Sequence, residues 1–433
     1  MSSAKTMTRT QAVFIGIGAM VGAGIFALLG EAGAIALSAV WLSFLLAGIV
    51  AGLQGYSFAQ LGKKYASAAG LVGYLAAGYG KRSWMMSISA WLAWTSTTIV
   101  LAMVAVSFGT YAAATITGGD MPPTLTKVMA TAIVVAVTLL IGLGGAEAVA
   151  KTQSWVIRLV IVVLLGLAAV TMLTADWSLL APSTYPPVRA VIGSIALTFF
   201  AFLGFGVVSF TAKDLKDVRD LGPATYIALA LTTLIYVAIS LGVFGQLTPE
   251  QVTAAGPTAI ALAARPVLGD LGYWVVAVTA MLSTAGAVNS TMYPAPNLLS
   301  YLAEEGIFPP LFDRKIGSFH SGLLLSSLVT LAFIWFFNLT AIASLGSAVA
   351  LLIFLSISVG HFRIRTQTAA NPAILVVAIL SVVVTLVGFL TTTLAESPSS
   401  LLAFVGLLIL TVILDGAWRM WRTGHVSRPS PTR

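Results

Sequence analysis

The chain has 433 residues, of which 58% are hydrophobic and 8% are charged, and its formal net charge is +8 at pH 7. A soluble protein of ordinary composition has about a quarter charged residues, so this composition excludes a soluble globular protein. The sequence contains no cysteine, which excludes disulfides and thiol chemistry.

The apolar residues come in repeated runs of about 20, and a hydrocarbon core of roughly 30 Å needs about that many helical residues. We therefore predict an all-α integral membrane protein with about twelve transmembrane helices in a single domain, residues 1–433. The predicted spans are 11–32, 37–58, 84–116, 126–145, 154–174, 190–210, 223–246, 271–302, 321–337, 340–360, 373–393 and 399–420. The polar stretch 248–270 can hold either a short surface helix or a plain loop.

The basic residues are distributed unevenly between the two faces of the predicted membrane domain. With twelve spans, eighteen of the 22 Lys and Arg residues fall on the face that carries the N-terminus, three fall on the other face, and Arg158 lies inside a span. This asymmetry predicts that both termini are cytoplasmic, including a tail at 421–433. It also explains the positive charge without nucleic acid, and the lack of a cleavage site favours a retained first helix in a bacterial inner membrane.

The first span reads FIGIGAMVGAGIF and is interrupted by Gly22, Ala23 and Gly24. Its glycines have a second interpretation, because Gly18 and Gly22 are four residues apart and can form a close helix-packing face without any break. The sixth span is interrupted by Gly204 and Gly206. Five spans separate the two interruptions, so these segments cross the membrane in opposite senses, as in an inverted repeat.

A broken helix leaves backbone groups without partners inside the membrane, and a ligand can supply those partners. The helix beginning beyond the first break offers N–H groups and a positive dipole end to an anion such as a carboxylate. Carbonyl groups at the second break suit an ammonium group. Together, the two breaks predict a site for a zwitterion.

Four motifs, in the right order, resemble those of the amino acid–polyamine–organocation transporters. They are VGAGIF (21–26), SFAQLGKKYASAAGLVGYL (57–75), FFAFLGFGVVSFTAKDLKDV (199–218) and VNSTMYPAPNLLSYLAEEGIFPPLFDRK (288–315). The resemblance implies the LeuT-type 5+5 inverted repeat with broken helices 1 and 6 and two additional C-terminal helices. Repeat 1 then spans about 11–174, repeat 2 about 190–360, and helices 11 and 12 about 373–420.

The resemblance also implies a substrate site at the two breaks. Backbone N–H groups near Gly22 to Gly24 are expected to meet the substrate carboxylate, and carbonyls near Phe200, Ala201 and Leu203 its amino group. Phe200 is also the expected gate. The full expected set is Val21, Gly22, Ala23, Gly24, Ile25, Phe200, Ala201, Phe202, Leu203, Gly204 and Phe205.

Three positions depart from the family pattern. Gln60 stands where Glu is usual, Asn297 where Arg is usual, and Asp214 where Glu is usual. The first two changes remove charges of opposite sign. They affect the contacts that close the cytoplasmic side, and they leave the expected substrate site unchanged.

Arg158 has two interpretations. Some relatives carry a Lys on this helix in place of a sodium ion, although the family spacing puts that position nearer Val160. Alternatively, Arg158 lies roughly 10 Å deep and extends to the membrane surface. Ser283 and Thr284 are the other candidate ion-site residues.

An arginine does not release its proton in proteins, and no Asp, Glu or His is expected in the middle of a span, since the three histidines fall in loops or at span ends. We therefore predict exchange or facilitated diffusion without obligatory proton coupling. Proton- or sodium-coupled symport stays open.

The phenylalanines of the sixth span and the lack of an expected mid-span carboxylate favour neutral amino acids as substrates, with polyamines or cationic amino acids as the alternative. No nucleophile, base or metal-ligand set is expected at membrane depth, so we predict no enzymatic activity and no cofactor. A sensor that binds without transporting would share these features. The sequence does not indicate the oligomeric state.

Overall fold

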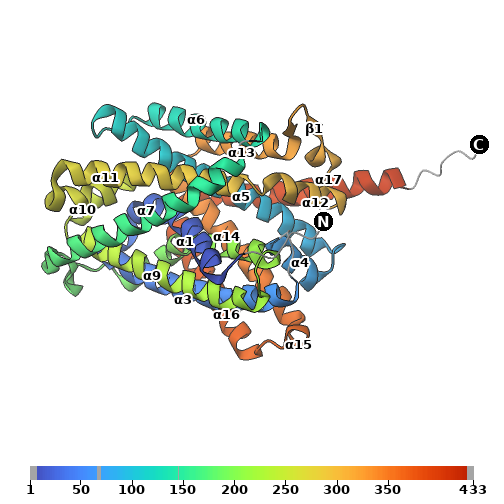
Figure 1. Ribbon diagram of the computed structural model, residues 1–433. Coiled ribbons are helices and arrows are strands. Elements are labelled where there is room, and N and C mark those ends of the chain that lie inside the picture. Colours follow the sequence, from blue (N-terminus) through green and yellow to red (C-terminus); the bar gives the residue numbers. More distant parts are fainter. Residues whose placement is uncertain (1–6, 66–69, 145, 427–433) are drawn as a thin grey trace, which may run out of the picture.

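The computed structural model describes residues 7–65, 70–144 and 146–426, which form a bundle of helices (Figure 1). The long helices are α1 (Arg9–Ala23), α2 (Ile25–Ala36), α3 (Val40–Lys64), α5 (Trp84–Thr117), α6 (Pro123–Gly142), α7 (Ala146–Leu173), α8 (Val188–Phe200), α9 (Leu221–Phe244), α11 (Ala259–Met292), α13 (Ser321–Phe336), α14 (Leu339–Arg363), α16 (Pro372–Phe389) and α17 (Pro398–Val426).

Shorter elements connect the long helices. They are the α-helices α4 (Leu71–Tyr79), α10 (Pro249–Ala255), α12 (Ala295–Glu304) and α15 (Arg365–Thr368), together with the 3₁₀ helix η4 (Leu203–Lys213) and a two-stranded antiparallel hairpin of β1 (Lys315–Ile316) and β2 (Phe319–His320). The helix α10 shows that the polar stretch 248–270 holds a short helix. It begins with a capping box. The Thr248 hydroxyl accepts a hydrogen bond from the Gln251 N–H, and the Gln251 side-chain oxygen accepts one from the Thr248 N–H.

The predicted all-α membrane class is confirmed. Among residues 7–65, 70–144 and 146–426, ten segments are long and apolar enough to cross a membrane, and α13 is a shorter apolar helix. That count joins α2 to α3 and omits the 15-residue α1, so it divides the chain differently from our twelve spans. The predicted span 271–302 is wrong at its end, because α11 ends at Met292 and a new helix, α12, begins at Ala295 after its N-cap residue Pro294.

The two halves of the chain contain matching elements. The helices α5 and α11 each have 34 residues, and each follows a short helix, α4 in the first half and α10 in the second. Figure 1 shows α4 and α10 toward opposite ends of the bundle. Matching elements at opposite ends are what two inverted repeats produce.

The end of the bundle that holds α4, α12 and α15 is called the basic end here. Lys63 and Lys64 close α3 just before α4, and Arg363 and Arg365 flank the start of α15. At this end, the segment before α1 pairs with the segment after η4. The Met7 N–H donates to the Asp214 carbonyl oxygen at 3.0 Å, and the Lys216 N–H donates to the Met7 carbonyl oxygen at 3.0 Å. These bonds tie the start of α1 to the end of η4.

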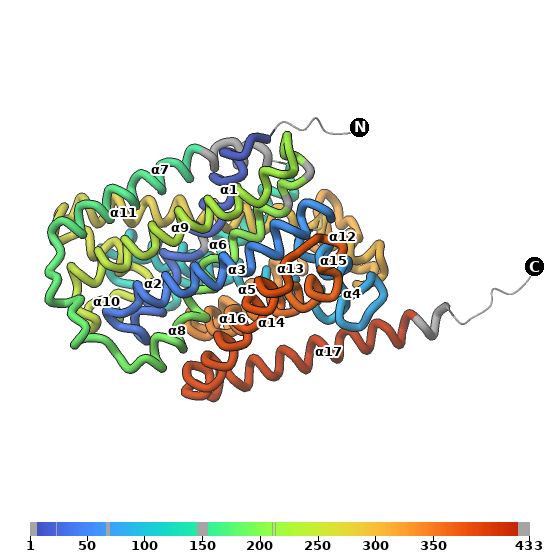
Figure 2. The backbone as a smooth tube through the Cα atoms, turned by 90° about the horizontal axis from the view of Figure 1, so that it is seen from below, coloured from blue at the N-terminus to red at the C-terminus, as the bar shows by residue number. Residues whose placement is uncertain are grey.

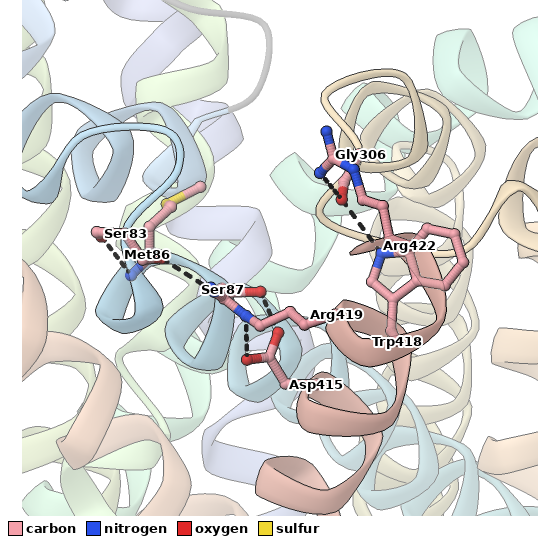
Figure 3. Close-up of polar contacts among 8 residues, drawn as sticks. All are labelled: Ser83, Met86, Ser87, Gly306, Asp415, Trp418, Arg419 and Arg422. Carbon is pink, nitrogen blue, oxygen red and sulfur yellow. Dashed lines mark hydrogen bonds and ion pairs between the residues drawn. The ribbon is translucent and has the colours of Figure 1, made fainter. Parts of the chain in front are cut away.

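The helix α17 lies at the edge of the bundle, on the side away from α1 (Figure 2). Its last turns attach to the basic end through polar contacts, which Figure 3 shows. Asp415 is 1% exposed; it accepts a hydrogen bond from the Ser87 hydroxyl and pairs with Arg419 at 2.8 Å. Arg422 and Trp418 both donate to the Gly306 carbonyl oxygen, at 2.8 and 3.2 Å. Ser87 on α5 and Gly306 just after α12 thus each bond to a different part of the C-terminal helix.

Candidate functional site

The first helix interruption is a single residue, Gly24. The helix α1 ends at Ala23, α2 begins at Ile25, and Gly24 between them has φ −99° and ψ −79°. The interruption is therefore narrower than the three residues predicted from sequence, because Gly22 and Ala23 stay helical. The side chain of Ala23 lies outside the described part of the structure. Three chain segments meet where α2 begins: the break at Gly24, the end of α8 at Ala201, and α9 at Tyr236.

Gly22 has a packing role in this structure. A Cβ at Gly22 would lie 2.8 Å from the Cβ of Ala287 and 3.0 Å from the carbonyl oxygen of Ser283, both on α11. A Cβ at Gly18 would likewise lie 2.6 Å from Cγ1 of Ile157 on α7. The close-packing interpretation of Gly18 and Gly22 is therefore realised alongside the break at Gly24.

The second interruption lies at Ala201 and Phe202. The helix α8 ends at Phe200, and the next two residues form a turn in which the Ala201 N–H donates to the Thr198 carbonyl at 3.1 Å and the Phe202 N–H to the Phe199 carbonyl at 2.9 Å. The chain then continues as the 3₁₀ helix η4. This change from α-helical to tighter bonding leaves carbonyl groups at the end of α8 without helical partners.

The predicted position of the second interruption, at Gly204 and Gly206, is wrong: the two glycines lie two and four residues after the turn at Ala201 and Phe202. Both glycines lie inside η4. A Cβ at Gly204 would overlap the backbone of Ala19 and Met20 in α1. Gly204 is therefore needed for the close approach of η4 to α1, and this packing role produces the same glycine pattern as a break.

Tyr236 on α9 connects the two interruptions. Its hydroxyl donates to the Ala201 carbonyl oxygen at 3.2 Å and lies beside Gly24, close to the N–H of Ile25, the first residue of α2. A Cβ at Gly24 would overlap both the Tyr236 hydroxyl and the Ala201 carbonyl oxygen. The Tyr236 ring is fully buried against Phe44 and Phe202, with centroids 5.3 and 5.1 Å away. One hydroxyl thus bridges the N-terminal end of α2 and the C-terminal end of α8.

Our sequence analysis missed Tyr236. A signal was available, since it is the one residue with a hydroxyl on an aromatic ring in the run LTTLIYVAIS, and a buried tyrosine hydroxyl needs a partner inside the protein. The partner could not be identified from the sequence, because Tyr236 and Ala201 are 35 positions apart and lie on different helices.

The phenylalanines around the second interruption point in different directions. Phe200 is 2% exposed and contacts Gly346 on α14, while Phe202 packs on Tyr236. Phe199 and Phe205 both pack on Phe354 of α14, with centroids 5.4 and 5.3 Å away. Phe199 and Phe205 therefore pack in the core between α8, η4 and α14.

The other predicted site residues are close in sequence to the two breaks. Val21 and Ile25 are 1% and 0% exposed on either side of Gly24, and Leu203 is partly buried at the start of η4. The breaks themselves lie at Gly24 and at Ala201, whose carbonyl oxygen would be overlapped by a Cβ at Gly24.

Arg158 lies on the outside of the bundle. Its side chain is exposed and stacks on Trp155 and Phe14, with the guanidinium carbon 5.0 and 5.8 Å from the two ring centroids. Of the two interpretations of Arg158, this arrangement matches extension along the surface.

A cavity of about 10 Å³, close to the size of one water molecule, lies between α1, α7 and α11. Val21, Val160 and Ser283 are among the residues that line it. Val160 is the position to which the family spacing pointed. Thr284 is buried next to this cavity, and its hydroxyl donates to the Ala280 carbonyl oxygen at 2.7 Å. The lining is mainly apolar, and Ser283 supplies its polar side chain.

The expectation about ionisable side chains holds for His361, which is buried in the last turn of α14. His361 pairs with the Ser57 hydroxyl at 3.0 Å and the Thr368 hydroxyl at 2.9 Å. The expectation is wrong for Asp415, which is 1% exposed inside α17, within the predicted span 399–420. Glu31 lies in α2 and is partly buried, close to Thr340.

Comparison with known proteins agrees with the features described above. A family model described as "Amino acid permease" matches residues 8–414. The inner membrane transport protein YbaT of Escherichia coli is 31% identical over 408 residues, which cover 93% of this chain and 94% of YbaT. The methylthioribose transporter of Bacillus subtilis is 25% identical over 84% of this chain and 83% of its own length.

A solved structure has the same fold. The manganese transporter of Eremococcus coleocola superposes with a TM-score of 0.60 and covers 94% of this chain and 96% of its own, at 14% sequence identity. At that identity the likeness concerns the fold alone. It agrees with the LeuT-type architecture that the four sequence motifs implied.

Proposed function

We propose that this chain, which belongs to the amino acid permease family, carries neutral amino acids across a membrane by alternating access, through exchange or facilitated diffusion. Membership of the amino acid permease family supports a transporter rather than an enzyme. The substrate class, the coupling and the site residues are our proposal. The two helix interruptions and the residues around them support this proposal.

The observation that carries the proposal is the single hydroxyl that bridges both interruptions. Tyr236 donates to the Ala201 carbonyl at the end of α8, and the same hydroxyl lies next to Gly24 and the Ile25 N–H at the start of α2. An amino acid has a carboxylate for the N-terminal end of α2 and an ammonium group for the carbonyl end of α8. The substrate's two charged groups can therefore bond to the same two helix ends that Tyr236 joins.

The side chains around the second interruption favour an apolar side chain on the substrate. Phe200, Phe202 and Tyr236 surround the second interruption, each with 2% exposure or less. The buried carboxylate Asp415 lies on the peripheral helix α17 and is paired with Arg419 (Figures 2 and 3). A cationic side chain at the breaks would meet aromatic rings rather than a carboxylate, so neutral amino acids fit better than polyamines or cationic amino acids.

The surroundings of the small cavity support transport without obligatory ion coupling. Val160 and Val21 line it, and the exposed Arg158 does not. A cation-coupled carrier needs a charge or a set of oxygen ligands that the transport cycle can fill and empty. Ser283 offers one hydroxyl and a nearby carbonyl, which is a small ligand set for sodium.

The orientation and the repeat boundaries complete the proposal. We place the basic end in the cytoplasm of a bacterial inner membrane, with both chain ends on that side. The repeats run from about 11 to 174 and from about 190 to 360, with two further helices at about 373–420. The proposed substrate contacts are the Gly24 region, with Val21, Gly22, Ala23 and Ile25, and the Ala201 region, with Phe200 as the gate and Phe202, Leu203, Gly204 and Phe205 beside it.

Uptake into proteoliposomes tests this function. A panel of radiolabelled neutral amino acids, cationic amino acids and polyamines is offered to vesicles with and without internal substrate, under separate proton and sodium gradients. We expect uptake of neutral amino acids that internal substrate stimulates and neither gradient drives. Uptake driven by a proton or sodium gradient would replace exchange with symport. Binding in detergent with no uptake of any compound would instead indicate a membrane sensor.

A further inference from the structure

The tip of the Phe200 ring lies against the backbone of α14 at Gly346. A Cβ at Gly346 would overlap Cζ of Phe200 and would lie 2.8 Å from its Cε1. The same Cβ would lie 2.9 Å from Cγ2 of Ile99 on α5. The missing side chain at Gly346 therefore leaves a notch, with Ile99 as its other wall, and the Phe200 ring fills that notch.

An added methyl group at Gly346 has to displace a side chain, because the backbone around it is held in a long helix. Gly346 is buried in the interior of α14, seven residues after the helix begins, and its backbone bonds belong to the helix ladder. Ile99 is 0% exposed and branched at Cβ, which limits its rotation. The ring tip of Phe200 is the atom group that can move by turning its side chain.

Movement of the Phe200 ring bears directly on the second helix interruption. Phe200 is the last residue of α8, and the next residue, Ala201, holds the carbonyl bonded to Tyr236. The ring and that carbonyl are therefore attached to adjacent Cα atoms. A ring expelled from the notch has to take up room beside the interruption, because the interior around it is close-packed.

We propose that Gly346 is a specificity-determining residue: its notch seats the ring of Phe200 and so sets the room left for the substrate's side chain at the second interruption. This inference rests on the proposed function, in which an amino acid binds at that interruption. It makes two separate claims. The first concerns the empty protein, where Gly346 and Phe200 are coupled through direct contact. The second concerns transport, where the size of the substrate's side chain matters.

The first claim is tested without any substrate, by a double-mutant cycle on thermal unfolding of the purified protein in detergent. We expect Gly346→Ala to lower the unfolding midpoint and Phe200→Leu, which shortens the ring, to lower it separately. In the double variant the penalty of the added methyl group should largely disappear. Additive shifts would overturn the notch, because independent residues show no coupling. Gly166→Ala on α7 is the matched control, since its added methyl group meets open space.

The second claim is tested by uptake of alanine and leucine into proteoliposomes. We expect Gly346→Ala to raise the KM for leucine by about tenfold or more, the range for a misfit of one methyl group in an apolar pocket, and to change the KM for alanine much less. Phe200→Leu in the same background should restore leucine uptake. An equal rise for both substrates would overturn the specificity role. If the wild-type protein takes up neither compound, the proposed function fails, whereas the coupling measured on unfolding still decides the notch.

Discussion

The Tyr236 hydroxyl lies 3.2 Å from the carbonyl oxygen of Ala201 and donates a hydrogen bond to it, so a side chain on α9 closes the open end of α8. Without substrate, this carbonyl would otherwise face an apolar interior, where an unpaired backbone group is costly. The hydroxyl thus stabilises an interruption that a continuous helix would not have. The same hydroxyl lies beside Gly24, so the second interruption is next to the start of α2.

Tyr236→Phe should impair transport while leaving the fold intact. The variant keeps the ring contacts with Phe44 and Phe202, but it leaves the Ala201 carbonyl without its donor. An unsatisfied buried acceptor costs about 1–3 kcal/mol, so we expect a lower unfolding midpoint and at least a tenfold loss of uptake, roughly the equivalent of 1.4 kcal/mol. Uptake assays and thermal unfolding in detergent measure the two effects.

The matched control for this prediction is Tyr111→Phe. Tyr111 is also fully buried, and its hydroxyl donates to the Pro257 carbonyl oxygen at 2.6 Å, near the end of the bundle that holds α10. The same atom is removed and a carbonyl again loses its donor. We expect a similar loss of stability with little change in uptake. An equal loss of uptake in both variants would mean that stability alone explains the result for Tyr236.

Gly24→Ala should abolish substrate binding. The added methyl group would overlap the Tyr236 hydroxyl and the Ala201 carbonyl oxygen, and it would lie 2.8 Å from the Met20 carbonyl oxygen. Two of these atoms are backbone, so they cannot turn away. Substrate-dependent thermal stabilisation and uptake should both disappear, because a folded protein with no site gains nothing from ligand.

Gly52→Ala is the control for Gly24→Ala. Gly52 lies within α3, and an added Cβ there meets no atom within 4 Å. Replacing a glycine inside a helix by alanine gains about 1 kcal/mol in helix propensity, so we expect equal or higher stability and normal uptake. Normal uptake by the Gly24 variant as well would refute the placement of the substrate at the first interruption.

Asp415→Asn should destabilise the attachment of α17. Removing one partner of a buried ion pair typically costs about 3–5 kcal/mol, but the Arg419 side chain is 39% exposed and can turn toward water. We therefore expect a loss of about 1–3 kcal/mol in the free energy of unfolding, measured by thermal or denaturant unfolding in detergent. Arg219→Gln breaks a pair whose side chains are 85% and 42% exposed, and it should leave the unfolding midpoint unchanged within the error of the measurement.

The membrane class and the existence of two interruptions could be predicted from the sequence, because apolar runs and paired glycines are local features. The exact position of a break could not. Gly204 and Gly24 look alike in the sequence, yet Gly204 is required by the close approach of the α1 backbone and Gly24 by the Tyr236 hydroxyl. A glycine reports that a side chain is not tolerated, and the neighbour that excludes it is known only from the fold.

The direction in which a side chain points from a helix could not be predicted from the sequence either. Arg158 and Val160 are two residues apart on α7, and one is exposed while the other is 2% exposed beside the cavity. A shift of two positions turns a helical side chain by about 200°, so a small error of alignment exchanges the outside for the inside. The burial of Asp415 was missed for a related reason, since its partners Ser87 and Arg419 come partly from a helix more than 300 positions away.

The pair Arg158 and Val160 gives the test of ion coupling. Arg158→Lys should leave uptake and its pH profile unchanged, because the exposed side chain stays charged and keeps access to the membrane surface.

Val160→Lys puts an ammonium group into the small apolar cavity beside Ser283. An ammonium group loses its proton as the pH rises and carries its charge at acidic pH. Uptake by this variant should therefore fall as the pH is lowered, since the charge must be accommodated between α1, α7 and α11. Radiolabel uptake across a pH series, with internal and external pH equal, measures both profiles. A pH dependence that appears in Arg158→Lys and not in Val160→Lys would show that the guanidinium, in spite of its exposed position, acts at the coupling site.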